Sequence, residues 1–361
     1  MLHTKPLWIH STVWRQGEAS ATNHFVYGLA VSNQGTILAF AESRLQHQDD
    51  APHHLVLKRS TDGGLTWGPA QTIEQSIAGE CWANPTALVE RNSGRIFLFY
   101  VLNEHNSATR VFYRTSDDDG LSWSPRHEVT EPLTADNPYG WTVFMPGPGH
   151  GVQLSNGRLI LPLWARKEIT LSATERDYGN RLLYSDDQGE TWHAGGIVPL
   201  NRELRNNESR IVELSDGMLL WNARTFSRNH RAMSLSRDQG MTWSPMVPYT
   251  KLPVQYACDG GFVTWANAPG YERAPLLYST ISKQRHDPEN TLQVYLSVDD
   301  GNSWPLSKTV HNGPCNYSDI AVMPDGTVVV LYGAGALPQC RSAAVSVSCV
   351  RFNAVWFHAQ E

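Results

Sequence analysis

Short runs of alternating apolar and polar residues recur along the chain, and each run ends at a polar turn. Residues 55–59, 111–113 and 294–296 are three of these runs. Alternation of this kind is typical of strands that bury one face. Residues 95–101 are almost wholly apolar, which predicts a strand buried on both faces. The hydrophobic pattern therefore predicts an all-β fold.

Several of these strands run into one repeated sequence, Ser-x-Asp-x-Gly-x-Ser/Thr-Trp. The copies begin at Ser60, Ser116, Ser185, Ser236 and Ser297, which are 56, 69, 51 and 61 residues apart. Five copies with five fixed positions identify an internal repeat. Each aspartate can accept hydrogen bonds from backbone amides two residues on, and each glycine tolerates a positive φ, which predicts a hairpin turn. We expect the tryptophan to cover the hairpin corner and interpret these aspartates as structural.

The spacing of the repeat fits one four-stranded sheet with its connection. Five marked repeats and one unmarked closing sheet predict a six-bladed β-propeller with the repeated turns in five blades. The closing blade would pair residues 7–10 and 13–14 with the tail, residues 345–357. No linker or charge block marks a boundary, so we expect a single domain over residues 1–361.

Composition narrows the possible functions and compartments. The 13 Trp, 13 Tyr, 28 Gly and 21 Pro suit a β fold with many turns, and a net charge of −6 without a basic cluster argues against nucleic-acid binding. The N-terminus lacks the apolar core of a signal peptide, and no stretch approaches a membrane span. We expect a cytoplasmic protein, although a secreted protein whose signal had been removed would look the same.

Several kinds of chemistry have no support in the sequence. The five cysteines are odd in number and lack metal-type spacing, which argues against a disulfide framework and a metal site. They are Cys81, Cys258, Cys315, Cys340 and Cys349. The chain contains no zinc-protease, serine-hydrolase or dinucleotide motif, and residues 147–149 are not followed by the Gly-Lys-Ser/Thr of a phosphate loop. We expect neither a metal nor a cofactor.

Polar residues at strand ends are the candidates for chemistry. A loop at residues 45–52 carries Asp49, and it is either a ligand-facing loop or a solvated one. Glu208 precedes one strand and Arg224 ends the adjoining strand, a pattern that also fits a surface ion pair. Arg285 lies in a polar stretch, and Tyr317 precedes an apolar strand.

Taken together, these pieces resemble a sialidase over almost the whole chain, from about Phe25 to the C-terminus. The five hairpins are similar to that family's Asp-boxes, which also occur in unrelated propellers. The ordered motifs between the hairpins are more specific. They are Phe40-Ala41-Glu42-Ser43-Arg44 followed by Asp49, Asn84-Pro85, Gly147-Pro148-Gly149, Asn207-Glu208-Ser209 with Asn222-Ala223-Arg224, and Asn316-Tyr317-Ser318-Asp319.

The resemblance implies a role for each matching position. Tyr317 would be the nucleophile, Glu208 the base that activates it, and Asp49 the acid/base. Arginine suits the binding of a substrate carboxylate because its planar fork donates two charge-assisted hydrogen bonds, and Arg224 and Arg285 look like two of the family's three clamp arginines. Arg44, His24 and Asn84 are further candidate substrate contacts. A tyrosine avoids the repulsion between a carboxylate nucleophile and an acidic sugar, and sialidases are a known exception to the two-carboxylate scheme.

The sequence departs from the family pattern at the first clamp arginine. The family has an Arg-Ile-Pro motif there, whereas this chain has His24 or Phe25, depending on a one-residue gap. Losing one arm of a buried ionic clamp costs roughly 2–5 kcal/mol. The substrate therefore differs from ordinary sialic acid, or another donor (His24, Asn23 or Arg44) helps to hold the acid.

The resemblance implies a retaining exo-glycosidase that removes a terminal acidic 2-keto sugar, such as sialic acid, Kdn or Kdo, from a glycan. One alternative is a propeller that binds carbohydrate without cleaving it, which the missing arginine favours and the set Asp49, Glu208 and Tyr317 disfavours. The other alternative is a glycosidase or lyase acting on uronic acids, and a lyase would release a product that absorbs ultraviolet light.

Overall fold

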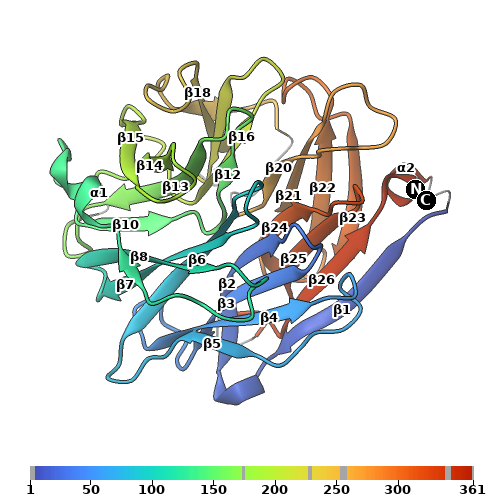
Figure 1. The fold of residues 1–361 in the computed structure, drawn as a ribbon, viewed down its shortest axis with the longest axis horizontal. Coiled ribbons are helices and arrows are strands. Elements are labelled where there is room, and N and C mark those ends of the chain that lie inside the picture. Colours follow the sequence, from blue (N-terminus) through green and yellow to red (C-terminus); the bar gives the residue numbers. More distant parts are fainter. Residues whose placement is uncertain (1–4, 173–174, 227–229, 253–257, 338–342, 360–361) are drawn as a thin grey trace.

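The computed structural model describes residues 5–172, 175–226, 230–252, 258–337 and 343–359. Its sheets stand around a common centre as an all-β propeller, and the two ends of the chain lie together at one side of the ring (Figure 1). Cys340 lies outside the described residues, and the other four cysteines are buried free thiols. Within the described ranges no helix is long and apolar enough to cross a membrane.

Three sheets are antiparallel (Figure 1). The first comprises β10 (Val143–Pro146), β12 (Val152–Gln153), β13 (Leu159–Arg166), β14 (Gly179–Ser185) and β15 (His193–Ile197); the second β16 (Ser209–Glu213), β17 (Leu219–Ala223), β18 (Arg231–Ser236) and β19 (Val247–Tyr249); the third β20 (Phe262–Thr264), β21 (Leu276–Ile281), β22 (Thr291–Ser297) and β23 (Leu306–Asn312). In the first of them, β10 and β12 both pair with β13.

A fourth sheet joins the two ends of the chain. It comprises β24 (Cys315–Val322), β25 (Val328–Ala334), β26 (Ser346–Phe352) and β1 (Trp8–Arg15). β1 pairs antiparallel with β26, so that Trp8 lies opposite Phe352 and Arg15 opposite Ser346. The first strand of the chain is therefore the outermost strand of the last sheet, beyond β26.

The remaining sheet has nine strands and consists of two successive meanders. The first comprises β2 (Asn23–Val31), β3 (Ile37–Arg44), β4 (His53–Ser60) and β5 (Gln71–Glu74); the second β6 (Cys81–Val89), β7 (Ile96–Glu104), β8 (Ala108–Ser116) and β9 (His127–Glu128), with β11 (Gly149–His150) beside β6. A single parallel pair, His53 with Cys81, joins β4 to β6. The helices are short: a 3-10 turn (Glu18–Ser20), α1 (Glu131–Ala135) and α2 (Ala354–His358).

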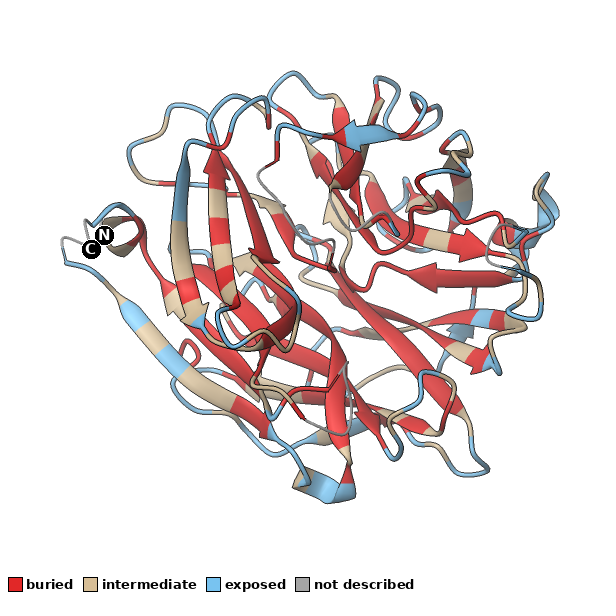
Figure 2. Ribbon diagram, turned by 180° about the vertical axis from the view of Figure 1, so that it is seen from behind, coloured by how far each residue is buried: buried red, intermediate tan, exposed pale blue. Residues whose placement is uncertain are grey.

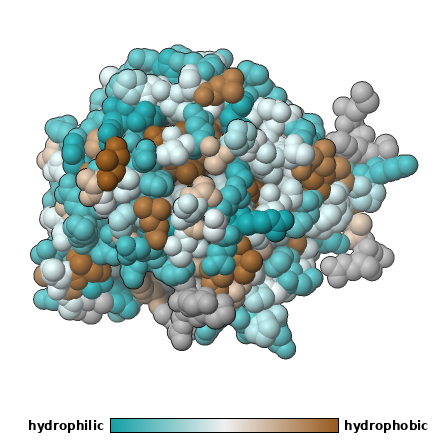
Figure 3. Space-filling model, turned by 90° about the horizontal axis from the view of Figure 1, so that it is seen from below, coloured by the Kyte–Doolittle hydropathy of each residue, from teal (hydrophilic) through white to brown (hydrophobic). Residues whose placement is uncertain are grey.

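The hydrophobic core lies between the faces of neighbouring sheets. One apolar cluster joins β7 to β10, β13 and β14, and another joins β13 and β14 to β16 and β17. The buried residues follow the strands, and the exposed ones follow the connections (Figure 2). On the face shown in Figure 3, apolar side chains are scattered among hydrophilic ones.

The repeated turns are built by their own side chains. In the first copy the Asp62 carboxylate accepts hydrogen bonds from the Leu65 and Thr66 amides and the Thr66 hydroxyl. The amide partners lie three and four residues on, rather than the two expected. The Ser60 hydroxyl donates to Asp62 and accepts from the Gly64 amide. In a later copy, the Trp192 indole packs edge-on against Phe99 of β7, in the neighbouring sheet.

Candidate active site

The starts of the inner strands and the ends of the strands that follow them meet at one mouth of the central channel, because neighbouring strands are antiparallel. Glu208 directly precedes β16 and Tyr317 lies near the start of β24, whereas Arg44 ends β3 and Arg224 follows β17. Seven of the eight predicted site residues line a cavity of about 250 Å³ at this mouth, and His24 does not.

Tyr317, Glu208 and Arg224 form a hydrogen-bonded triangle at this mouth. The Tyr317 hydroxyl donates to Glu208 Oε1, and Arg224 Nη1 lies 2.5 Å from Glu208 Oε2 and 2.7 Å from the Tyr317 oxygen. Burial raises the pKa of Tyr317 well above its ordinary value, with Glu208 adding to the rise and Arg224 opposing it. The resting phenol is therefore neutral, and its natural proton acceptor is Glu208.

Arg285 lies over two aromatic rings of the same mouth. Its guanidinium carbon is 4.8 Å from the centre of the Tyr317 ring and 5.7 Å from that of Phe25. It makes no hydrogen bond or ion pair with any residue that the structure describes, apart from these ring contacts. Its N–H groups are therefore available to an anionic ligand beside Tyr317.

Asp49 stands at the rim of the cavity, on the loop between β3 and β4. Its side chain is 76% exposed, and its Oδ1 accepts a hydrogen bond of 2.6 Å from Arg44 Nη1. Partial desolvation acts to raise the pKa of Asp49, but the charge and hydrogen bond of Arg44 outweigh it and lower that pKa below its ordinary value. The free protein therefore holds Asp49 as a carboxylate.

Asn84 lines the cavity at an irregularity in β6. Its φ is 57°, which is unusual for a residue other than glycine, and the β6–β7 register shifts between Ala83 and Thr86. The Asn84 amide donates to Glu42 Oε1 at 2.9 Å, and its side-chain nitrogen donates to the Pro146 carbonyl at 3.0 Å. Asn84 is thus held by Glu42 of β3 and by Pro146 of β10.

His24 is a correction to the prediction that it holds the substrate. Its ring stacks on Trp14, with centroids 5.3 Å apart, away from the cavity. Burial lowers the pKa of His24 to about 4, so the ring is also uncharged at neutral pH. The next residue, Phe25, lines the cavity, with its ring centroid 4.8 Å from that of Tyr317. An apolar ring therefore stands beside the nucleophile candidate.

Sequence reasoning gave no role to several residues that line this mouth. Glu42 belongs to the motif Phe40-Ala41-Glu42-Ser43-Arg44. Its spacing of two residues from Arg44 could have indicated a contact, because it puts both side chains on one face of β3. Asn103 and Met145 also line the cavity, and no sequence pattern pointed to them. Trp164 also lines the cavity, whereas Trp141 is buried in the core. Among the described residues, no group of three or more His, Cys, Asp or Glu could hold a metal.

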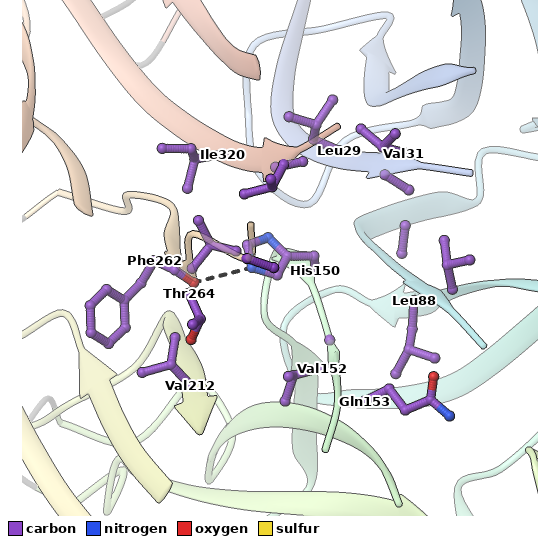
Figure 4. A pocket seen from close by; sticks show the side chains of 18 of the residues that line it. Leu29, Val31, Leu88, His150, Val152, Gln153, Val212, Phe262, Thr264 and Ile320 are labelled. Atoms are coloured by element: carbon purple, nitrogen blue, oxygen red, sulfur yellow. Dashed lines mark hydrogen bonds between the residues drawn. The ribbon is translucent and has the colours of Figure 1, made fainter. Parts of the chain in front are cut away.

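A second cavity of about 330 Å³ opens at the opposite mouth, where the same inner strands end (Figure 4). Its wall is mostly apolar and includes Leu29, Leu88, Val212 and Ile320. His150, the polar residue at its centre, has Nδ1 2.8 Å from Asp319 and Nε2 3.2 Å from the Phe262 carbonyl oxygen, so both ring nitrogens already have protein partners.

A buried ionic layer lies between the two cavities. Arg210 is fully buried, with Nη2 3.0 Å from Asp259 and Nε 3.4 Å from Asp319. Along the chain, Arg210 is two residues beyond Glu208 and Asp319 is two residues beyond Tyr317, toward the apolar mouth. The channel is therefore filled by side chains between its mouths.

Comparison with known sequences places these features in context. The profile of the BNR repeat-like domain matches residues 34–330. A sialidase of Micromonospora viridifaciens is 30% identical over 98% of this chain and 55% of its own length. Mouse Sialidase-4 is 34% identical over 68% of this chain and 54% of its own length. This chain thus spans about half the length of both proteins. Bovine Sialidase-3 is 28% identical over 86% of this chain and 85% of its own length.

Solved structures agree on the fold. The Hadza microbial sialidase Hz136 superposes with a TM-score of 0.80 at 22% identity, covering 96% of this chain and 68% of its own. The intramolecular trans-sialidase of Ruminococcus gnavus superposes with a TM-score of 0.78 at 19% identity, covering 97% of this chain and 99% of its own. At these identities the superposition shows a shared fold.

Proposed function

Because this chain belongs to the sialidase family and carries its BNR repeat-like domain, we propose that it is a retaining exo-glycosidase that removes a terminal acidic 2-keto sugar from a glycan. Sialic acid, Kdn and Kdo are the candidate sugars. The observation that carries the proposal is the convergence of Tyr317, Glu208 and Arg224 through hydrogen bonds in one cavity.

In the first half of the reaction, Arg285 and Arg224 bind the sugar carboxylate and set the anomeric carbon above Tyr317. Glu208 takes the phenolic proton as the tyrosine oxygen bonds to that carbon, because a buried neutral phenol is a weak nucleophile without an adjacent base. Asp49 in its acid form gives a proton to the leaving glycosidic oxygen. The aglycone departs, and a sugar–tyrosine intermediate remains.

In the second half, Asp49 is a carboxylate and accepts a proton from water, which attacks the anomeric carbon. The carbon–tyrosine bond breaks, and Glu208 returns the proton to the phenolate. Two displacements at one carbon give retention of configuration. The Arg44 contact with Asp49 favours the ionised acid that this second half needs.

We further propose that the nine-stranded sheet counts as two blades, because only one residue pair joins its two meanders. The ring then has six blades in a single domain over residues 1–361. Asp-box turns occur in five blades, and β1 completes the sixth beside β26. Loops from different blades thus bring Asp49, Arg285 and the triangle to one mouth.

One observation favours a second candidate, a propeller that binds an acidic sugar without cleaving it. Phe25 occupies a wall of the cavity where the family resemblance leads us to expect an arginine, so that the acid has fewer charged partners. The hydrogen bond from Tyr317 to Glu208 argues for catalysis, because a purely binding site gains nothing from a base on a tyrosine.

The proposed function is tested by release of 4-methylumbelliferone from α-glycosides of N-acetylneuraminic acid, Kdn and Kdo, with a β-glucuronide beside them. We expect release from at least one keto-acid sugar and its loss in Tyr317→Phe. Tyr332→Phe is the matched control, because Tyr332 is buried in the adjacent strand β25. If folded protein released nothing from any of the four glycosides, the propeller that binds an acidic sugar without cleaving it would be favoured. Release from the glucuronide alone would favour an enzyme that acts on uronic acids.

A further inference from the structure

Arg44 has almost no hydrogen-bonding capacity left for a substrate. Its Nε and Nη2 donate to Glu42 Oε2 at 2.9 and 2.6 Å, and its Nη1 donates to the His47 carbonyl at 3.2 Å and to Asp49 at 2.6 Å. A guanidinium has five N–H groups, so these four contacts leave one. A forked grip on a substrate carboxylate needs two.

Glu42 fixes Arg44 to the neighbouring blade. Its side chain is 1% exposed, Oε2 accepts both hydrogen bonds from Arg44, and Oε1 accepts from the Asn84 amide at 2.9 Å. Asn84 belongs to β6, in the second meander of the nine-stranded sheet. A buried carboxylate with three donors thus joins the end of β3 to the irregular part of β6.

The backbone around Asp49 is also held in place. Three successive carbonyl oxygens of the loop have side-chain partners. Arg44 donates to the first, at residue 47; His53 Nε2 lies 2.9 Å from the second, at residue 48; and Asn103 Nδ2 donates to the third, at residue 49, at 3.4 Å. Among the described residues the Asp49 carboxylate forms one ion pair, with Arg44. His53 and Arg285 also lower the pKa of Asp49 through their charges.

From these contacts we propose that Glu42 and Arg44 are positioning residues that aim the Asp49 carboxylate at the glycosidic oxygen, and that Arg44 is not a ligand of the substrate carboxylate. The proposal rests on the proposed glycosidase function. It leaves Arg224 and Arg285 as the two arginines that bind the acid, with Phe25 in place of the third.

Arg44 also acts on Asp49 through charge. Arg44 favours the carboxylate, whereas leaving-group departure needs the acid, so kcat/KM falls as pH rises through the pKa of Asp49. Removing the Arg44 charge raises that pKa and shifts the fall to higher pH. Burial raises the pKa of Glu42 to about 7 despite the opposing charge of Arg44, so Glu42 carries little charge where Asp49 titrates and Glu42→Gln should leave the fall near its wild-type pH. A shift in Arg44→Met is not expected from a merely structural residue.

The test compares Arg44→Met and Glu42→Gln with wild type on two substrates of one sugar. The sugar is whichever glycoside the wild-type protein hydrolyses. The methylumbelliferyl group leaves as a weakly basic phenolate and needs little help from an acid. The methyl glycoside has a strongly basic leaving oxygen, which must be protonated by Asp49 for the bond to break. We expect Arg44→Met to lower kcat/KM by roughly 10²-fold on the methyl glycoside and by less than about tenfold on the other. Arg59→Met is the control, since it breaks an ion pair with Asp119 at an outer turn.

A binding measurement separates positioning from substrate recognition. The dissociation constant of the free sugar acid, measured by calorimetry, should change less than about twofold in Arg44→Met and at least about tenfold in Arg224→Ala. A tenfold weakening in Arg44→Met, or equal losses on both glycosides, would overturn the proposal. If Arg44→Met fails to fold, Glu42→Gln decides the matter, because it keeps the side chain's shape but weakens its hold on Arg44. We then expect a larger loss of kcat/KM on the methyl glycoside than on the methylumbelliferyl glycoside, and equal losses would overturn the proposal. A wild-type protein inactive on both glycosides would instead contradict the proposed function.

Discussion

The two mouths of the central channel are built by the same inner strands, but their chemistry is opposite. Where β16 and β24 begin, Glu208 and Tyr317 meet Arg224 in a charged cavity. Where those strands end, Val212 and Val322 belong to an apolar wall (Figure 4). A propeller strand can therefore contribute to stability at one end and carry polar site residues at the other, because its two ends face different cavities.

The ionic layer between the mouths explains how they stay separate. Arg210 with Asp259 and Asp319 fills the channel and is fully buried. A buried charge that loses its partner is costly, so this layer resists rearrangement. Substitutions at one mouth should therefore leave the other mouth intact, and activity should separate from stability.

The largest effect is expected at the charged mouth, from Tyr317→Phe. The change removes the oxygen that would bond to the sugar, so kcat should fall by at least about 10³-fold. The melting temperature should move by no more than a few degrees, because the ring and its packing remain. Steady-state hydrolysis and thermal unfolding of the same preparation measure both quantities, and undiminished turnover would remove tyrosine from the mechanism.

Arg224→Ala should have the next largest effect. It removes a ligand of the acid and leaves Glu208 without its cation, so kcat should fall and KM rise, lowering kcat/KM by roughly 10²-fold. Hydrolysis measured across substrate concentrations separates the two constants. If only the melting temperature changed, Arg224 would be a structural ion pair and the comparison of the mouths would lose its basis.

At the apolar mouth, Leu88→Ala should lower stability and leave activity unchanged, the reverse of what we expect at the charged mouth. Leu88 is 2% exposed and packs in the core, so truncation should lower the free energy of unfolding by about 2–5 kcal/mol. The value of kcat/KM should stay within about twofold of wild type. Denaturant unfolding and hydrolysis at a temperature where both proteins are folded test this. A loss of activity as large as that of Arg224→Ala would mean that the mouths are coupled.

The smallest effect concerns carboxylates that belong to neither mouth. Despite opposing desolvation, hydrogen bonds in the repeated turn lower the pKa of Asp62 from 3.8 to about 2. A carboxylate whose pKa is lower in the folded than in the unfolded state adds stability above its unfolded pKa, and this is lost as pH falls toward the folded value. Melting temperatures should therefore fall more steeply below about pH 4 in wild type than in Asp62→Asn. Parallel curves would contradict a structural role for the turn.

The sequence could predict the parts of the molecule that have local signals. The all-β propeller followed from alternation and a repeated turn, and the family motifs pointed to Glu208, Arg224 and Tyr317, which the structure brings together. These motifs can be recognised in the sequence because each one lies where a strand begins or ends. The relation between motifs on different blades was visible only through the family resemblance.

The parts that the sequence could not predict depend on register and on long-range contacts. His24 and Phe25 exchange roles because the β2–β3 register shifts between Phe25 and Tyr27, with Val26 at a φ of 52°. A shift of one residue turns each side chain to the other face of a strand, and no local pattern announced it. Glu42 was likewise unassigned. Its spacing to Arg44 could be read from the sequence, but its contact with the backbone of Asn84 in the second meander could not.

The central claim is that Tyr317 bonds to the sugar. The most direct measurement is peptide mass spectrometry after incubation with a 3-fluoro glycosyl fluoride of the sugar that the protein releases, because the second fluorine slows breakdown of a covalent intermediate. We predict one sugar adduct, on the peptide that contains Tyr317, and none in Tyr317→Phe. An adduct on Asp49 or Glu208, or rapid hydrolysis of the fluoride with no adduct at any time, would contradict it.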